Sequence, residues 1–243
     1  MERIDKILAL HNYGSRKEVG GLIRSGAVTV NGAPVRKSDL KIDPERDEVR
    51  VSGERAVLRK RVVLMMHKPA GVLSATRDGK GETVLDLLPP ELYRRGLFPA
   101  GRLDKDTTGL LILTDDGDLA HRMLAPKSHV YKLYEARLDK PASPEDAEAF
   151  ARGLQAGELE CLPAELTFTG DPLTVRVRVR EGKFHQIKRM FHAVGKEVTA
   201  LKRLSIGGLR LDPALAPGEA RFLTAAEEAL IFEEGGCAQI LRI

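Results

Sequence analysis

The segment from Leu173 to Arg180 alternates strictly between apolar side chains and threonine or arginine. Successive side chains of a strand point to opposite faces, so this period of two predicts a half-buried β-strand. Apolar runs at 62–66, 110–113 and 131–138 predict further strands, interleaved with helical segments without a regular βαβ rhythm. The expected fold is therefore α+β, with a largely antiparallel sheet.

The helices of the larger part are predicted from their end signals. Residues 118–124 form a short helix stopped by Pro126, and Ser143-Pro144-Glu145 begins one that runs to about Leu154. A helix over 186–194 is closed by Gly195. Thr224 with Glu227 forms a capping box before a last helix.

The first 58 residues have the pattern of a compact module of two short helices and a small sheet. Ile4, Ile7, Leu8 and Leu10 follow helical spacing, and a second helix begins at Ser15 with a capping box to Glu18. Asn31-Gly32 between short apolar runs predicts a hairpin, followed by a strand at 48–51. Residues 53–60 are polar and predict a linker, which divides the chain into domains 1–58 and 59–243.

Positive charge is concentrated in two regions. The net charge is +4 with a pI near 9.1; residues 1–60 hold 13 Lys/Arg against 9 Asp/Glu, and residues 174–203 hold nine against two. Such regions attract phosphate backbones, so nucleic acid is a natural partner. The alternative is ordinary solvated helix and sheet faces.

Export, membrane insertion and a disulfide framework are not indicated. The start of the chain carries charges where a signal peptide needs an apolar stretch, and no window approaches the length of a membrane span. Cys161 and Cys237 lack metal-type spacing. The expected location is the cytoplasm.

The densest polar constellation is the run from Gly101 to Gly109, which carries Asp104 and Asp106 just before an apolar strand. Three interpretations fit it. One is a calcium loop, although position 12 is Asp115 rather than a glutamate. Another is a glycosidase-like pair of acids. The third is a structural turn whose aspartates cap backbone amides.

Two further groups of side chains also have open interpretations. Arg176, Arg178 and Arg180 share one strand face, which is either a track for RNA or a solvated face of the sheet. His185 and His192 are seven residues apart, and packing or surface roles are favoured over metal ligation because no third ligand is evident.

Five ordered motifs together resemble the RsuA branch of the RNA pseudouridine synthases. They cover nearly the whole chain, and the N-terminal module resembles the S4 RNA-binding domain that precedes the enzyme in this branch. The matching segments are His67-Lys68-Pro69-Ala70-Gly71, Gly101–Gly109 with Leu110–Thr114, Lys132-Leu133-Tyr134, Glu181–Met190, and Arg203–Gly208 with Leu215–Glu219. His67 departs from the family, which usually has asparagine there.

The resemblance implies an isomerase that detaches a uracil from C1′ of its ribose, turns it and rejoins it through C5. Asp104 is implied as the catalytic acid, acting at C1′ or on the C2′ proton, with Lys188 holding a positive charge beside it. Tyr134 is implied to stack on the flipped base, which must leave its own stack to react. Implied RNA contacts are Arg3, Lys6, Ser15, Arg16, Lys17, Arg24, Lys68, Arg102, Thr107, Gln186 and Arg189.

The resemblance also implies a ribosomal substrate. The segments 185–195 and 206–208 look most like the enzyme of the small subunit, so 16S rRNA modification of the pseudouridine-516 type is expected. The alternatives are a 23S rRNA enzyme of the same branch, or an rRNA-binding assembly protein without catalysis. The partner is ribosomal RNA or a pre-ribosomal particle, with no membrane, metal or cofactor implied, and nothing demands more than a monomer.

Overall fold

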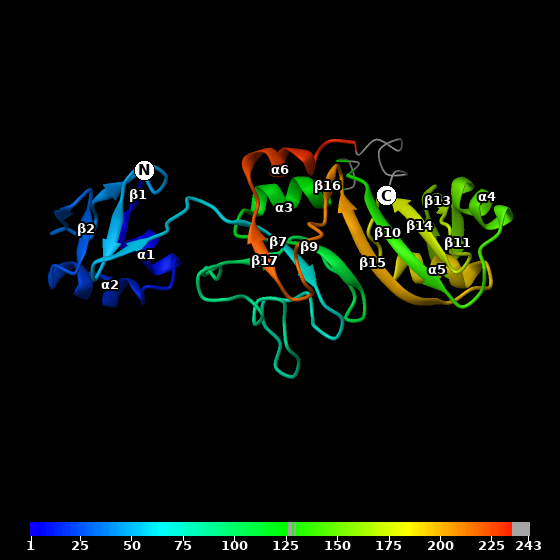
Figure 1. Cartoon of the computed structure of the whole chain (residues 1–243), viewed down its shortest axis with the longest axis horizontal. Helices are drawn as coiled ribbons and strands as arrows, with labels where there is room; N and C mark the ends of the chain where they lie inside the picture. Colours follow the sequence, from blue (N-terminus) through cyan, green and yellow to red (C-terminus); the bar gives the residue numbers. More distant parts are fainter. Residues whose placement is uncertain (126–127, 129, 235–243) are drawn as a thin grey trace.

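The computed structural model describes residues 1–125, 128 and 130–234. Figure 1 shows a smaller N-terminal body joined by an extended segment to a larger one. The smaller body, here called the N-terminal module (residues 1–58), has its own core extending from Ile4 to Leu58. Its elements are β1 (Glu2–Arg3), α1 (Ile4–Leu10), α2 (Arg16–Arg24), β2 (Val28–Val30), β3 (Ala33–Pro34), β4 (Lys41–Ile42), β5 (Val49–Val51) and β6 (Glu54–Ala56).

Most of the helix caps and turns predicted in the N-terminal module are present in the structure. Ser15 and Glu18 form the capping box of α2. Asn31 and Gly32 both have positive φ, which allows the tight hairpin between β2 and β3. The predicted linker at 53–60 is wrong in its first half, because Glu54–Ala56 pairs with β5. A second two-residue turn with positive φ at both positions, Ser52-Gly53, makes this hairpin.

The larger body is built on one mixed sheet. Its strand order in the described part of the chain is β13-β14-β10-β15-β9-β7-β17, with β16 on β15 and β8 on β9. Among these described strands, only β9 and β15 pair in parallel, so the predicted α+β fold with a largely antiparallel sheet is confirmed. The strands are β7 (Val63–Lys68), β8 (Phe98–Pro99), β9 (Thr108–Thr114), β10 (Lys132–Leu138), β13 (Glu165–Phe168), β14 (Thr174–Val179), β15 (Val198–Ile206), β16 (Leu209–Arg210) and β17 (Ala220–Phe222).

Hydrophobic cores lie on both faces of this sheet. The first joins β10 and β14 to Phe150 of α4 (Pro144–Arg152) and Phe191 of α5 (Gln186–Ala193). The second lies between β7 and β9 on one side and α3 (Gly117–Leu124) and α6 (Ala225–Leu230) on the other. Figure 1 shows α3 and α6 together above the central strands. A small hairpin of β11 (Leu154–Ala156) and β12 (Leu159–Cys161) packs against α5.

Two helix boundaries differ from prediction. The helix begun by Ser143 ends at Arg152, because Gly153 adopts a φ of +77° and Leu154 starts β11. The helix from Gln186 ends at Ala193, with the predicted Gly195 just beyond it at positive φ. No helix among the described residues is long and apolar enough to cross a membrane. Pro126 and Cys237 lie outside the described residues.

Candidate active site

The Asp104 loop, residues 101–109, is folded into a turn that presents one carboxylate. The Thr107 amide donates to the Asp104 carbonyl at 3.1 Å. The Ser74 hydroxyl donates to the carbonyl of Leu103 at 2.9 Å and accepts from its amide at 3.1 Å. Leu103 itself is buried in the core. These contacts fix the backbone on either side of Asp104, whose side chain stays 25% exposed.

Lys68, at the end of β7, holds the far side of this loop. Its Nζ donates to the carbonyls of Pro69, Lys105 and Thr107 at 2.9, 3.2 and 3.0 Å. The side chain is fully buried, and burial lowers the pKa of Lys68 to about 8. The three internal hydrogen bonds give Lys68 a structural role, and an RNA contact by Lys68 stays a prediction. Its ammonium is enclosed by the loop that it supports.

Gly109 joins the loop to the sheet through a very close backbone contact. It lies in register with Lys68 on β7 and with Arg203 on β15. Its φ is +104°, and a Cβ atom there would lie 2.2 Å from the Arg203 carbonyl oxygen. Glycine is required at this position by both conformation and space.

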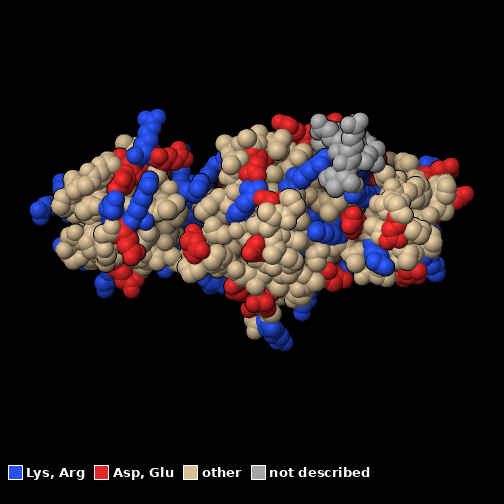
Figure 2. All heavy atoms as spheres, viewed as in Figure 1, with Lys and Arg blue, Asp and Glu red and all other residues tan. Residues whose placement is uncertain are grey.

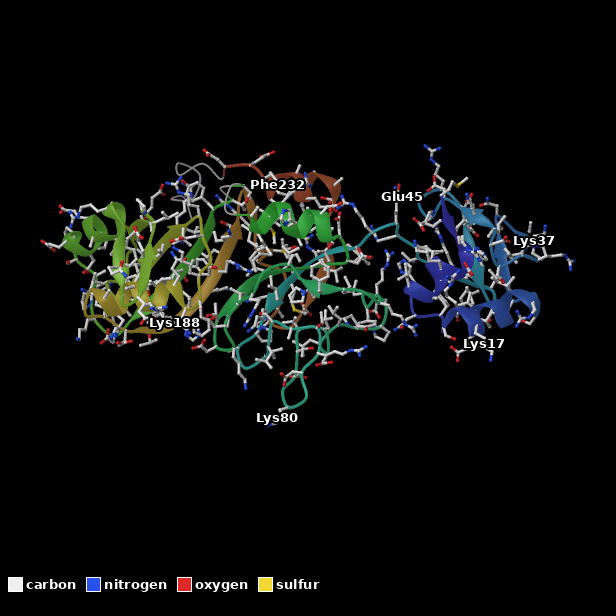
Figure 3. The ribbon with its side chains drawn as sticks, turned by 180° about the vertical axis from the view of Figure 1, so that it is seen from behind. Lys17, Lys37, Glu45, Lys80, Lys188 and Phe232 are labelled. Atoms are coloured by element: carbon white, nitrogen blue, oxygen red, sulfur yellow. The ribbon has the colours of Figure 1, made fainter. Side chains whose placement is uncertain are left out.

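The Asp104 carboxylate faces two side chains from the start of α5. His185 Nε2 lies 3.5 Å from Oδ1, and Lys188 Nζ lies 3.5 Å from Oδ2. His185 has a left-handed φ of +51° at the N-terminal boundary of α5. That conformation is uncommon for a residue other than glycine, and it accompanies the placement of the imidazole at the acid. Lys188 on α5 is labelled in Figure 3.

Asp106 makes the shorter contact with the same lysine. Lys188 Nζ donates to the two Asp106 oxygens at 2.6 and 2.8 Å. This hydrogen bond, together with the charge of Lys188, lowers the pKa of Asp106. Asp106 therefore orients Lys188 beside Asp104, from a side chain that is itself 73% exposed.

Tyr134 forms the opposite wall of the site from the central strand β10. Its side chain is nearly buried, and its partner in register on β15 is Arg203. Arg203 donates through Nε to the Leu110 carbonyl at 2.7 Å and through Nη1 to the Tyr134 hydroxyl at 3.3 Å. The ring is thereby fixed by the sheet rather than by a loop.

Asp104 and Tyr134 line one narrow cleft with a cavity of about 60 Å³. The predicted contacts Thr107 and Gln186 are buried in its wall, and Thr107 Oγ1 has no hydrogen-bond partner among the described residues. The predicted contact Arg102 is exposed at this cleft. The other lining residues are Leu103, Val179, Glu181, Gly182, Lys183, His185, Ile187 and Leu201.

Arg189, the other RNA contact predicted near this site, has a structural partner. Its Nη2 donates to the Ala156 carbonyl at 2.9 Å, which ties α5 to β11. The side chain is half-buried. An RNA contact by Arg189 stays a prediction.

The six RNA contacts predicted in the N-terminal module fall into two groups. Arg3 and Arg16 both pair with the nearly buried Asp5, at 3.0 and 2.7 Å, and the Ser15 hydroxyl caps α2. These three side chains already have internal partners. Figure 2 shows acids interspersed with the cations on the face of the module that it presents. All five cations of the set are exposed, and Lys6 also has an internal partner, Glu2 at 3.0 Å. Lys17 and Arg24 have no ion pair among the described residues.

Sequence reasoning missed the contributions of His185 and Arg203. The sequence favours packing or surface roles for His185 over metal ligation because no third ligand is evident. The structure places it at the helix boundary, turned toward Asp104. Arg203 stands in a predicted family segment, but its neighbours Tyr134 and Leu110 come from other strands. No local signal identifies such a contact.

The structure also bears on two interpretations left open by the sequence, the calcium loop and the arginine face of β14. Residues 108–114 form β9, so the calcium-loop interpretation, which needs flanking helices, is wrong. Arg176 and Arg178 have side chains only 18% and 12% exposed, with Glu135 and Glu165 at 3.7 and 3.2 Å. The arginine face is therefore not simply solvated.

Two known protein families match this chain. Residues 62–193 match the RNA pseudouridylate synthase family, and residues 2–56 match the S4 domain. The uncharacterized RNA pseudouridine synthase YtzG of Bacillus subtilis (strain 168) is 49% identical over 95% of this chain and 98% of the relative. Ribosomal small subunit pseudouridine synthase A of Escherichia coli (strain K12) is 41% identical, over 94% of this chain and 99% of that protein.

A solved structure agrees over the same extent. The crystal structure of a pseudouridylate synthase, 35% identical, matches 95% of this chain and all of its own chain with a TM-score of 0.65. The two matched regions appear in the order that the sequence predicts, one within each body of the molecule. The chain therefore belongs to the RNA pseudouridylate synthase family, and it is an isomerase that carries an S4 domain in front of its synthase domain.

Proposed function

We propose that this enzyme converts one uridine of small-subunit ribosomal RNA to pseudouridine, in a modification of the pseudouridine-516 type. The observation that carries the proposal is the Asp104–Lys188 contact in a cleft walled by Tyr134, in a chain of this family. Relatives matched over nearly their full length are named as small-subunit enzymes, which favours this substrate over 23S rRNA. Such a substrate, as free RNA or a pre-ribosomal particle, sets the cytoplasm as the working compartment.

Asp104 acts on the ribose of the target uridine. The N1–C1′ bond breaks, the uracil turns, a C5–C1′ bond forms, and the proton lost from C5 is balanced by one gained at N1. Asp104 acts through its carboxylate, and Lys188 Nζ at 3.5 Å places a positive charge beside it. Thr107 and Gln186, in the cleft wall, contact the nucleotide.

Tyr134 supplies the stacking surface for the uracil. Its ring is held by β10 and by the Arg203 hydrogen bond, so it is in place before RNA arrives. A base that leaves its stack regains part of the lost energy on an aromatic face. The Tyr134 hydroxyl assists the movement of the C5 proton.

RNA is anchored on both sides of the cleft. We assign residues 1–58 as the RNA-binding domain, with Arg3, Lys6, Ser15, Arg16, Lys17 and Arg24 toward the backbone, and residues 59–243 as the synthase domain. Arg102 and Arg189 contact RNA near the cleft. Phosphate contacts of this kind fix register without reading sequence.

The test is pseudouridine formation by Asp104→Asn, compared with Asp106→Asn as a matched change in the same loop. Asp104→Asn is expected to lose at least about 10³-fold in rate, and Asp106→Asn much less. Modification by Asp104→Asn at the parent rate contradicts the assignment of the acid. Mapping pseudouridine in both ribosomal RNAs, with and without the chain, tests the substrate. A site lost from 23S rRNA instead of 16S rRNA replaces the small-subunit assignment.

A further inference from the structure

A second, larger cavity adjoins the catalytic cleft. It has a volume of about 580 Å³, and its lining shares Arg102, Tyr134, Glu181, Gly182 and Lys183 with that cleft. Five cationic side chains line it, and we call it the basic cavity. They are Arg102, Lys132, Arg180, Lys183 and Arg203.

Two of these cations are buried side by side without a counter-charge. Lys132 is 8% exposed and Arg203 is 4% exposed. Arg203 uses Nε and Nη1 for Leu110 and Tyr134, but its Nη2 is buried with no hydrogen-bond partner among the described residues. The Lys132 side chain has no hydrogen bond or ion pair among the same residues. Burial, with the charge of Arg203, lowers the pKa of Lys132 to about 8.

The acid in the lining does not neutralise this pair. Glu181 accepts hydrogen bonds from the Gln186 side chain and the Leu162 amide, both at 2.8 Å, and pairs with Lys183 at 2.8 Å. Its charge is therefore already engaged. Unpaired buried cations destabilise a fold, so a cavity that keeps two of them is suited to an anion.

We propose that the basic cavity binds a backbone phosphate of the RNA strand next to the target uridine, with Lys132 and Arg203 as its ligands. The proposal rests on the proposed function, because it takes the uridine to occupy the Asp104 cleft. Arg102 and Tyr134 line both spaces, so the two adjoin, and a strand whose base stacks on Tyr134 at Asp104 has its neighbouring nucleotide within reach of the basic cavity. The volume admits a nucleotide rather than a lone ion.

The cavity gives the enzyme a means of drawing the strand in. An ammonium and a guanidinium in a partly desolvated space attract a phosphodiester more strongly than exposed cations do. Binding there uses interactions remote from the reacting atoms to hold the uridine against Asp104.

The experiment measures binding of the full chain to 16S rRNA at a series of KCl concentrations. Lys132→Met removes a charge without removing an internal hydrogen bond, and Lys132→Arg restores the charge. The matched control is Lys202→Met, since Lys202 is the neighbour of Arg203 on β15 but lines a different cavity. Lys132→Met is expected to lower the slope of log K against log [KCl] by about 1. Lys132→Arg and Lys202→Met are expected to keep it.

A second measurement uses inorganic phosphate alone. Phosphate at constant ionic strength is expected to raise the Tm of the parent chain but not that of Lys132→Met. A salt slope unaffected by Lys132→Met overturns the proposal. If phosphate still stabilises the parent in that case, the cavity holds a free anion rather than RNA.

Failure of the proposed function is seen separately. Parent protein that forms no pseudouridine in either ribosomal RNA refutes that function, whatever the salt slopes show. If Lys132→Met still lowers the salt slope of RNA binding in such a protein, Lys132 contacts an RNA phosphate, but the adjoining cleft does not hold a target uridine.

Discussion

Two buried lysines flank the active site and differ in what surrounds their ammonium groups. Lys68 is enclosed by three carbonyl oxygens, whereas Lys132 faces a cavity beside Arg203 with no partner among the described residues. Burial lowers the pKa of both to about 8. The comparison teaches that burial of a cation does not reveal its role. The completeness of its hydrogen bonding separates a lysine that holds the fold from one suited to a ligand.

Gly109 is the position where a single change disrupts both regions together. It pairs with Lys68 on one side and Arg203 on the other, and an added Cβ would lie 2.2 Å from the Arg203 carbonyl oxygen. Gly109→Ala is expected to lower the free energy of unfolding by about 4 kcal/mol or more, because the backbone must move. Urea unfolding measures this. Gly117→Ala, where a Cβ meets nothing within 4 Å, is the control, and equal losses in the two variants contradict the strained contact.

Lys68→Met tests the structural role of Lys68, the first of the two buried lysines. Removing the ammonium leaves the carbonyl groups of Pro69, Lys105 and Thr107 without their donor. The free energy of unfolding is expected to fall by about 3 kcal/mol, and pseudouridine formation to fall with it because Asp104 loses its support. Lys105→Met removes an exposed lysine from the same loop as the control. A Lys68→Met protein as stable as the parent removes the distinction between the two lysines.

Lys132→Met tests the second buried lysine, and here the substitution is expected to raise the free energy of unfolding rather than lower it. The pKa of Lys132 is about 8 in the folded chain and 10.5 for an ordinary lysine, so the unfolded chain binds more protons between these values. The contribution of Lys132 to stability therefore rises with pH across this window and is least favourable below pH 8. At pH 7, Lys132→Met is expected to be more stable than the parent by about 2 kcal/mol.

The pH series completes that test. Urea unfolding from pH 7 to pH 10.5 is expected to show the advantage of Lys132→Met shrinking as the parent lysine loses its proton. An advantage that is absent at pH 7 or grows with pH contradicts an unpaired, buried ammonium. Lys202→Met serves again as the control on the same sheet.

Sequence predicted the features that depend on neighbours along the chain. The capping boxes at Ser15 and Thr224, the helix start at Ser143-Pro144 and the Asn31-Gly32 turn need only local hydrogen bonds and φ values, and all of them are present. The Ser52-Gly53 turn was missed because serine is a weaker signal for positive φ than asparagine.

The site could be predicted in its residue types but not in its contacts. The loop motif and the family resemblance singled out Asp104, and they placed Lys188 near it. The enclosure of Lys68 depends on carbonyls 37 and 39 residues away, and Arg203 reaches Tyr134 across 69 residues. Such contacts are set by the register of β7, β9, β10 and β15. That register follows from packing of the whole sheet rather than from any local pattern.

Substitution of Lys17, in the N-terminal module, is expected to have the smallest effect on stability. It provides an exposed lysine with which the two buried lysines can be compared. Lys17 is an exposed lysine on α2, labelled in Figure 3, with no ion pair among the described residues. Its ammonium is already hydrated, so Lys17→Met should change the free energy of unfolding by no more than about 0.5 kcal/mol at any pH between 7 and 10.5. If α2 faces RNA, the same change should still lower the salt slope of 16S rRNA binding by up to about 1. An exposed cation thus alters binding alone, whereas Lys132 is expected to alter binding and stability in opposite directions. A Lys17→Met protein that gains stability as Lys132→Met does would show that lost net charge, rather than relief of a buried cation, produces the gain.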